Sequence, residues 1–329
     1  MANKVLTKKN IFSENNKRVL VSLALYIGVV AIFLIFQLVC GLCGKHFITI
    51  NNIFNIITQA SIISIISIGA SMVILTGGID LSVGSIIGFV GILGGIMLKS
   101  GVNLFVTCMV CIIAGALMGL INGSLVSYGK VPAFIATLGM MQIVRGLALL
   151  INGGRPVSSF PDSLGKLMST RVFGKIPISI FYVAFFYILI SFIMSSTLFG
   201  RHVYALGGNP KAARLSGVHV KRVELLVYTL AGVFAAIGGI MLLSRLTYAD
   251  PNGGSGYEMS AIAATVIGGI SLSGGRGRIT NTLVGAILLS TLTAGLQILN
   301  VATYYQSIVV GIVIIGAVFI DKSNERKVE

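Results

Sequence analysis

The sequence predicts an all-α, polytopic integral membrane protein with about ten transmembrane helices, some of them discontinuous. Of its 329 residues, 55% are hydrophobic and only 10% are charged, whereas a soluble domain carries about 25% charged residues. The mean hydropathy is +0.98. So few charged residues cannot build a water-facing surface, and the 41 glycines follow no collagen-like period. Soluble, fibrous and disordered classes are therefore excluded.

Uncharged runs locate the expected spans, because about 20 apolar residues are needed to cross a bilayer. The runs are 19–44, 47–79, 81–98, 100–129, 131–151 (interrupted by Arg145), 176–200, 225–244, 259–275 and 279–320. The last run is long enough for two spans, with a fold-back near Asn300. The first is longer than the apolar region of a cleaved signal peptide, so we expect a retained helix.

The distribution of basic residues predicts the orientation. The chain has 24 Lys and Arg against nine Asp and Glu, a net charge of +15. With the N-terminus in the cytoplasm, inside segments hold 16 basic residues and outside segments hold seven, as the positive-inside rule requires. We expect cytoplasmic tails at 1–18 and 321–329 and a permease domain at 19–320, with a long cytoplasmic loop at 199–223. Topology explains the charge, so lipid and not nucleic acid is the expected neighbour.

One acidic residue lies between two long apolar runs with almost no polar loop. Gly77 and Gly78 would break a helix, and Asp80 and Ser82 could cap the next one. Helices are broken in this way where backbone lines a cavity. Two interpretations remain open: a capped tight turn at the cytoplasmic face, or a part of the translocation path or gate formed by Gly78, Asp80 and Ser82.

A second glycine-rich break has similar letters. The pattern G-I-x-L-S-x-G occurs at 78–84 and again at 269–275, which suggests two structural repeats. On the expected outer side, Asp250 and Glu258 flank a segment with three glycines and Tyr257. This segment either faces the mouth of the path, with Tyr257 and Glu258 beside the solute, or is a solvated turn with Glu258 near a helix N-terminus.

Motifs for catalysis are absent. The chain contains no G-x-x-x-x-G-K-[ST], no H-E-x-x-H and no G-x-S-x-G, so we expect no enzyme activity, no catalytic residues and no ATPase site of its own. The two C-x-x-C pairs, 40/43 and 108/111, belong to apolar runs and are interpreted as small buried residues, not as a metal site.

Glycine pairs four residues apart at 91/95 and 115/119/123 indicate close helix packing, within one chain or at a subunit interface.

The cytoplasmic loop contains a short helix with clear boundaries. Asn209 suits the N-cap, Pro210 the first helical position and Gly217 the position after the C-cap. About two turns of helix would be marginal in water alone. The helix is either a solvated loop element or a docking element that is ordered against a partner.

Several strings in this order resemble one known family. They are TGGIDLSVG at 76–84, PAFIATLG at 132–139, YALGGN at 204–209, GYE and AIAA at 256–264, GG at 268–269 with GGRGR at 274–278, and YYQ at 304–306. Over residues 50–321 the chain resembles the permeases of ribose-type sugar importers in the ATP-binding-cassette (ABC) class.

The resemblance implies a transmembrane permease subunit in the bacterial cytoplasmic membrane. It would move a neutral monosaccharide, such as ribose or a related pentose or hexose, by alternating access. The implied partners are a second permease copy, a cytoplasmic ABC ATPase that binds ATP and Mg, and an extracytoplasmic sugar-binding protein; the permease itself binds no cofactor. A nucleoside, a signalling sugar or a branched amino acid remains an alternative solute, and an ATPase-independent secondary transporter an alternative class.

The resemblance also assigns a role to the short helix. In this class a cytoplasmic loop with an E-A-A-x-x-x-G-like pattern docks into the ATPase. Ala212, Ala213 and Gly217 match that pattern, whereas Lys211 replaces the glutamate, which puts a salt bridge at this position in doubt. The expected docking residues are Asn209, Lys211, Ala212, Ala213, Arg214 and Gly217.

Overall fold

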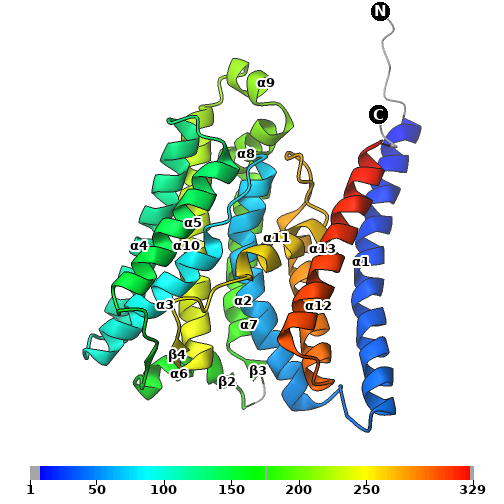
Figure 1. The fold of residues 1–329 in the computed structure, drawn as a ribbon. Helices are drawn as coiled ribbons and strands as arrows, with labels where there is room; N and C mark the ends of the chain where they lie inside the picture. The colour runs from blue at the N-terminus through cyan, green and yellow to red at the C-terminus, as the bar shows by residue number, and fades with distance from the viewer. Residues whose placement is uncertain (1–7, 175, 327–329) are drawn as a thin grey trace, which may run out of the picture.

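The computed structural model describes residues 8–174 and 176–326, and nearly all of its regular structure is helical (Figure 1). The long helices are α1 (Lys8–Leu42), α2 (Ile50–Leu75), α3 (Val83–Lys99), α4 (Leu104–Ser127), α5 (Ala133–Leu150), α7 (Ser179–Ser196), α10 (Val220–Leu246), α12 (Ile279–Ile298) and α13 (Thr303–Arg326). The short helices are α6 (Asp162–Ser169), α8 (Leu198–Gly208), α9 (Pro210–Leu215) and α11 (Tyr257–Ile267).

Four two-residue strands complete the described elements. Strand β1 (Val157–Ser158) pairs antiparallel with β4 (Tyr248–Ala249), and β2 (Arg171–Val172) pairs antiparallel with β3 (Ile176–Pro177). All four lie with α6 at one end of the helical bundle, opposite α9 (Figure 1). The β1–β4 pair fastens the long segment between α5 and α7 to the chain just after α10, whereas β2 and β3 pair within that segment.

Seven helices of the described chain are long and apolar enough to cross a membrane. They are the 25–42 part of α1 together with α2, α4, α5, α7, α10 and α12. Three shorter apolar helices, Val83–Lys99, Tyr257–Ile267 and Thr303–Phe319, occupy the remaining predicted positions. The fold-back predicted near Asn300 is confirmed, because α12 ends at Ile298, Asn300 has φ 60° and α13 begins at Thr303.

The predicted span 259–275 is wrong as a continuous helix. Helix α11 has only 11 residues and ends at Ile267. Gly269 follows with φ 83°, a left-handed conformation that glycine adopts without strain. Residues 268–278 then continue without helix to the start of α12. The uncharged run therefore contains a half-length helix and an irregular segment.

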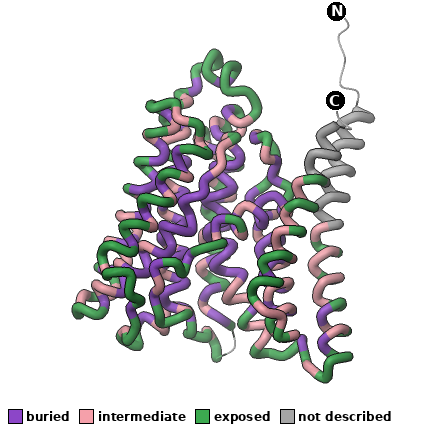
Figure 2. Tube along the Cα trace, viewed as in Figure 1, coloured by how far each residue is buried: buried purple, intermediate pink, exposed green. Residues whose placement is uncertain are grey.

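Helices α2 and α10 form the centre of the molecule, as the buried tube in Figure 2 shows. Helix α4 packs against α10 through three glycines, which approach the backbone of Tyr228, Thr229 and Gly232 and the chain at Leu225; these glycines are 115, 119 and 123. Removal of side chains from one helix face lets two backbones approach closely. The predicted glycine stripe on α4 is therefore used for packing within this chain.

Helices α1 and α13 lie at one side of the bundle (Figure 1). The first turn of α1 and the last turn of α13 are at the same end of the molecule as α9. This arrangement places the described parts of the two tails, residues 8–18 and 321–326, at the same end of the molecule as α9 of the 199–223 loop.

Candidate functional site

Helix α9 begins as the sequence predicts. The side-chain oxygen Oδ1 of Asn209 accepts a hydrogen bond from the backbone N–H of Ala212 over 3.0 Å. Pro210 occupies the first helical position, where no intrahelical N–H is needed. A six-residue helix gains little from internal hydrogen bonds, so this cap has a large share in defining its start.

The end of α9 is a Schellman motif. Gly217 has φ 86° and donates its N–H to the carbonyl of Arg214, while Val218 donates to the carbonyl of Ala213, both over 3.1 Å. The position after the C-cap thus needs a residue that tolerates positive φ, and glycine does. The predicted boundaries of the helix are confirmed at both ends.

The surface of α9 differs from the expected docking set in two respects. Lys211, Ala212 and Arg214 are exposed, but Ala213 is only 5% exposed and faces the chain itself. Leu215, which the sequence reasoning missed, is 89% exposed. The sequence does contain a signal for Leu215: it is an apolar residue between Arg214 and Ser216 in a basic loop. The free face of α9 combines one leucine with two cations.

The helix before α9 contacts the two glycine-rich breaks directly. The N–H of Gly275 donates to the carbonyl of Leu75 over 2.9 Å, at the end of α2. A Cβ atom on Gly207 of α8 would collide with that same carbonyl and with the backbone of Gly275. We call Leu75, Gly77, Gly207, Gly274 and Gly275 the glycine junction.

At the glycine junction the second string, 269–275, meets the residues just before the first string, Leu75 and Gly77. A Cβ atom on Gly274 would lie 3.0 Å from the nitrogen of Gly77 and 3.0 Å from the oxygen of Gly207. These separations are tighter than ordinary Cβ contacts, and Gly274 also has φ 83°, so a side chain there would be strained. The break after α2, the break after α11 and the helix leading to α9 therefore form one backbone-to-backbone contact.

Tyr204 of α8 strengthens the attachment to the second break. Its hydroxyl donates to the carbonyl of Gly277 over 3.0 Å. Burial raises the pKa of the Tyr204 phenol, while the neighbouring charge of Arg278 acts in the opposite direction. The hydroxyl therefore keeps its proton at neutral pH and remains a donor.

Asp80 is 3% exposed and lies in the irregular segment between α2 and α3. Its Oδ1 accepts from the backbone N–H of Ser82 over 2.8 Å and from the Ser82 hydroxyl over 2.6 Å. The Ser82 oxygen in turn accepts from the side-chain amide of Asn122 on α4 over 2.8 Å. The Thr137 hydroxyl on α5 donates to the carbonyl of Ile79 over 3.1 Å. The break is thus held by α4 and α5.

Ser82 does not cap α3 with its side chain, contrary to the prediction. It holds the N-cap position, but its hydroxyl joins Asp80 to Asn122 instead. The tertiary contact with α4 takes precedence over the local cap.

Three buried polar atoms beside this chain of hydrogen bonds have no partner among the described residues: Asp80 Oδ2, Asn122 Oδ1 and the Tyr228 hydroxyl. A Cβ atom on Gly78 would collide with that hydroxyl.

Glu258 stands in the first turn of α11 and is 9% exposed. Its Oε1 accepts from the N–H of Gly256 over 3.2 Å, and its Oε2 is buried without a partner among the described residues. A Cβ atom on Gly84, in the first turn of α3, would collide with Oε2. The Asp80 and Glu258 carboxylates therefore adjoin residues 82 and 84 of one helix start, where the helix dipole favours negative charge. Tyr257 beside Glu258 is half-buried.

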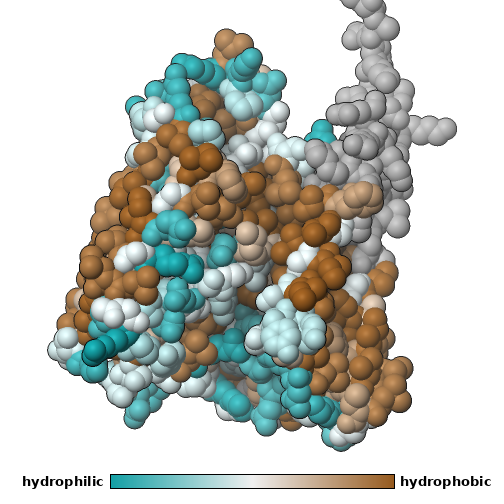
Figure 3. All heavy atoms as spheres, in the orientation of Figure 1, coloured by the Kyte–Doolittle hydropathy of each residue, from teal (hydrophilic) through white to brown (hydrophobic). Residues whose placement is uncertain are grey.

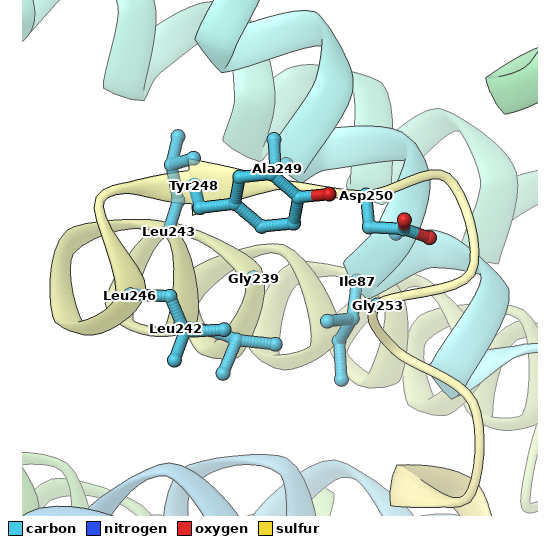
Figure 4. Close-up of a pocket in the computed structure, with 11 residues that line it drawn as sticks. Ile87, Gly239, Leu242, Leu243, Leu246, Tyr248, Ala249, Asp250 and Gly253 are labelled. Carbon is cyan, nitrogen blue, oxygen red and sulfur yellow. The ribbon is translucent and has the colours of Figure 1, made fainter. Parts of the chain in front are cut away.

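A cavity of about 260 Å³ lies between α3, the end of α10 and the segment after β4 (Figure 4). Ile87, Leu242 and Leu246 line it, and Tyr248 and Asp250 stand at its rim. Asp250 Oδ1 already accepts from the N–H of Asn252 over 2.7 Å. The walls are almost entirely apolar, so the cavity lacks the set of hydrogen-bonding groups that a polyhydroxylated solute requires.

The expected site residues thus form separate groups. Gly78, Asp80 and Ser82 lie together at the break before α3, and Tyr257 and Glu258 adjoin the first turn of the same helix. The residues of α9 lie apart at one end of the molecule (Figure 1). Helix α8, the neighbour of α9, is joined to both breaks by the glycine junction. The sequence comparison related the two breaks as similar strings but did not predict this contact.

The chain is similar to known membrane permeases over nearly its whole length. Residues 52–318 match the family described as branched-chain amino acid transport system / permease component. The ribose import permease protein of Escherichia coli strain K12 is 40% identical over 91% of this chain and 94% of its own length. The D-allose transport system permease protein of the same strain is 36% identical over 94% and 96% of the two chains. The autoinducer 2 import system permease protein of Photorhabdus luminescens is 34% identical over 89% and 88%. No solved structure matches the chain.

Proposed function

Because the chain belongs to this family of transport-system permease components, we propose that it is the transmembrane subunit of an ABC importer for a neutral monosaccharide. Ribose, or a related pentose or hexose, is the proposed solute. The observation that carries the proposal is 40% identity with a ribose import permease over 91% of the chain. The family match covers residues 52–318, which include both breaks, and this extent favours a common transport mechanism.

The proposed mechanism is alternating access driven by a separate ATPase subunit, which binds ATP and Mg. The exposed face of α9, with Lys211, Arg214 and Leu215, docks into that subunit. When the ATPase dimer closes, α9 and α8 move together and displace the glycine junction. Because packed backbones cannot deform continuously, a small shift there changes the two breaks as a unit. Asp80 and Glu258 then move with the start of α3.

The polar groups proposed for the path can offer hydrogen bonds to a neutral solute. Gly78, Asp80, Ser82, Tyr257 and Glu258 border the start of α3, and one carboxylate oxygen of each acid accepts a hydrogen bond within the chain. A sugar needs hydrogen-bond partners and no counter-charge. We propose these residues as parts of the gate that controls the path, because their carboxylates are buried rather than presented to an open cavity.

The proposed assembly contains a second copy of this chain, the ATPase and an extracytoplasmic sugar-binding protein, in the bacterial cytoplasmic membrane. The chain's N- and C-termini are proposed to be cytoplasmic. The ends of α1 and α13 on the α9 side, and 16 basic residues inside against seven outside, support this orientation.

A different sugar is the second candidate solute. The allose and autoinducer 2 permeases are 36% and 34% identical to the chain, close to the 40% for the ribose permease. Identity in this range does not separate these solutes, and in such systems the binding protein selects the sugar.

The test is purification of the chain with the ATPase and binding protein encoded beside it, followed by measurement of ATP hydrolysis in proteoliposomes. Ribose, allose and other pentoses and hexoses are added one at a time. We expect one sugar to stimulate ATP hydrolysis and to accumulate in the lumen when ATP is outside. Uptake of a charged amino acid, or sugar uptake without the ATPase, would contradict the proposal.

A further inference from the structure

Three buried polar side chains come together where α4 and α10 pack against the break before α3. Asp80 of the break is 3% exposed, Tyr228 of α10 is 1% exposed and Asn122 of α4 is 0% exposed. A Cβ atom on Gly123, next to Asn122, would lie 3.2 Å from the Tyr228 Cβ. A Cβ atom on Gly78, two residues before Asp80, would collide with the Tyr228 hydroxyl. Three separate segments therefore contribute to one buried polar group.

Hydrogen bonds inside this group determine which oxygens remain without a partner. Asp80 Oδ1 accepts from the N–H and the hydroxyl of Ser82, and the Ser82 oxygen accepts from the side-chain amide of Asn122. These bonds hold the carboxylate and the amide in fixed orientations. Their other oxygens, Asp80 Oδ2 and Asn122 Oδ1, have no partner among the described residues, and neither has the Tyr228 hydroxyl. The group thus contains three positioned oxygens that are free to bind a ligand.

The carboxylate of Asp80 needs a positive charge beside it. Both of its hydrogen bonds come from Ser82, which is neutral, and no described cation donates to Oδ2. The dipole at the start of α3 offsets only part of one charge. Hydrophobic surface covers both flanks of the face seen in Figure 3, so lipid and not water is expected beside the bundle there. Buried charges in proteins are paired with an opposite charge or bind a metal ion.

The three oxygens suit an alkali cation. One carboxylate balances one positive charge, whereas divalent and transition metals are usually held by several carboxylates or by His and Cys. The described residues contain no group of three His, Cys, Asp or Glu that could hold such a metal. In membrane proteins the ends of broken helices coordinate Na⁺, and this group lies between the end of α2 at Leu75 and the start of α3 at Val83.

A proton or a water molecule would satisfy the group less completely. The Tyr228 hydroxyl can donate, yet it bonds to neither of the other two oxygens. A proton on Asp80 would remove the charge but would not bridge groups that do not bond to one another directly. Water could bridge them but brings no charge. An alkali cation neutralises the carboxylate and binds all three oxygens, which replace its hydration shell.

We propose that Asp80 Oδ2, Asn122 Oδ1 and the Tyr228 hydroxyl bind one alkali cation, Na⁺ or K⁺, in the break before α3. The cation fastens the break to α4 and α10 at the same point. Ser82 is a positioning residue, because its hydroxyl orients both Asp80 and Asn122. The proposal goes beyond the proposed import function and does not rest on it.

The first experiment measures cation binding by thermal unfolding of the purified full chain in detergent. NaCl or KCl replaces choline chloride at constant ionic strength. A ligand that binds only the folded chain raises the Tm as its concentration increases. We expect at least one of the two salts to raise the Tm in a saturable manner, and the salt that acts at the lower concentration identifies the ion. If neither raises the Tm above that in choline chloride, the proposal is overturned.

The second experiment assigns the binding to these residues. Asp80→Asn is expected to abolish the rise in Tm, because the amide carries no charge. Asp250→Asn is the matched control and is expected to keep the rise. Asp250 Oδ1 also accepts from the N–H two residues later, as Asp80 Oδ1 does, but Asp250 is only half-buried and stands at the rim of the apolar cavity. Loss of the rise in both variants would overturn the assignment.

Two further variants keep the test decisive if Asp80→Asn does not fold. Loss of an outer partner of a metal ligand typically costs about 10–100-fold in metal affinity. Ser82→Ala is therefore expected to raise the half-saturating cation concentration by about that factor, and Tyr228→Phe, which removes a ligand, by about tenfold or more. A wild-type concentration dependence in both variants would refute the site.

Neither experiment uses sugar or ATP, so the cation site and the import function can fail separately. A cation response that depends on Asp80, without sugar-stimulated ATP hydrolysis, would uphold the site and refute the import function. Sugar-stimulated hydrolysis by a chain whose Tm responds to neither Na⁺ nor K⁺ would do the reverse.

Discussion

The backbone N–H of Gly275 donates to the carbonyl of Leu75 over 2.9 Å, although 200 positions separate the two residues in the sequence. The bond joins the irregular segment after α11 to the last turn of α2. Gly207 of α8 lies against the same carbonyl. A single point of contact therefore connects the helix next to α9 with both breaks in the membrane domain.

We expect Gly207→Ala to disrupt this contact. Its new methyl group would collide with the Leu75 carbonyl, and overpacking of this kind typically costs about 1–3 kcal/mol of stability. We expect a lower Tm in detergent and a loss of coupling between ATP hydrolysis and uptake. Gly208→Ala is the matched control, because nothing lies within 4 Å of its added Cβ. Equal behaviour of the two variants would remove the junction from the mechanism.

We expect Leu215→Ser to weaken ATPase docking without unfolding the permease. Leu215 is 89% exposed, so its replacement removes no internal packing. Co-purification of the ATPase subunit is expected to fall, with Tm unchanged. Ser216→Ala, at the neighbouring exposed position, serves as the control. Arg214→Glu should act in the same direction as Leu215→Ser, and unchanged ATPase recovery from both would exclude this face of α9.

We expect Asp80→Ala to be more harmful than Asp80→Asn. The alanine variant leaves the buried Ser82 N–H and hydroxyl without their acceptor, at a cost of about 1–3 kcal/mol. The asparagine variant keeps an oxygen there. Thermal unfolding of both variants measures the difference, and uptake by the asparagine variant isolates the effect of charge. If both variants retain wild-type Tm and uptake, Asp80 has no part in the break or in the gate.

We expect Gly119→Ala to separate α4 from α10. A Cβ atom there would collide with the carbonyl of Tyr228, at a close contact between these two helices. The expected loss is about 1–3 kcal/mol, measured as a lower Tm and reduced yield. Gly41→Ala in α1 is the control, because no atom lies within 4 Å of its added Cβ. An unaltered Tm for Gly119→Ala would contradict the tight packing.

The start and end of α9 could be predicted because caps depend on adjacent residues. Asn209 and Gly217 act on groups within four positions of themselves. The role of Ser82 could not be predicted in the same way. A serine at a helix start normally caps it, but Asn122 of α4 is brought beside this one by the fold. The length of α11 cannot be predicted from the sequence either, since an uncharged run does not distinguish a helix from an irregular segment.

The sequence by itself determined the membrane class, the approximate positions of the spans, the limits of the short loop helix and the places where glycine breaks the apolar runs. Those properties follow from hydropathy and from local backbone chemistry, which act over a few residues. Only the tertiary structure decided that Gly275 meets Leu75, that Ala213 faces inward while Leu215 is free, and that the glycines of α4 are covered by α10. These are contacts between distant segments, and they depend on how whole helices pack against one another.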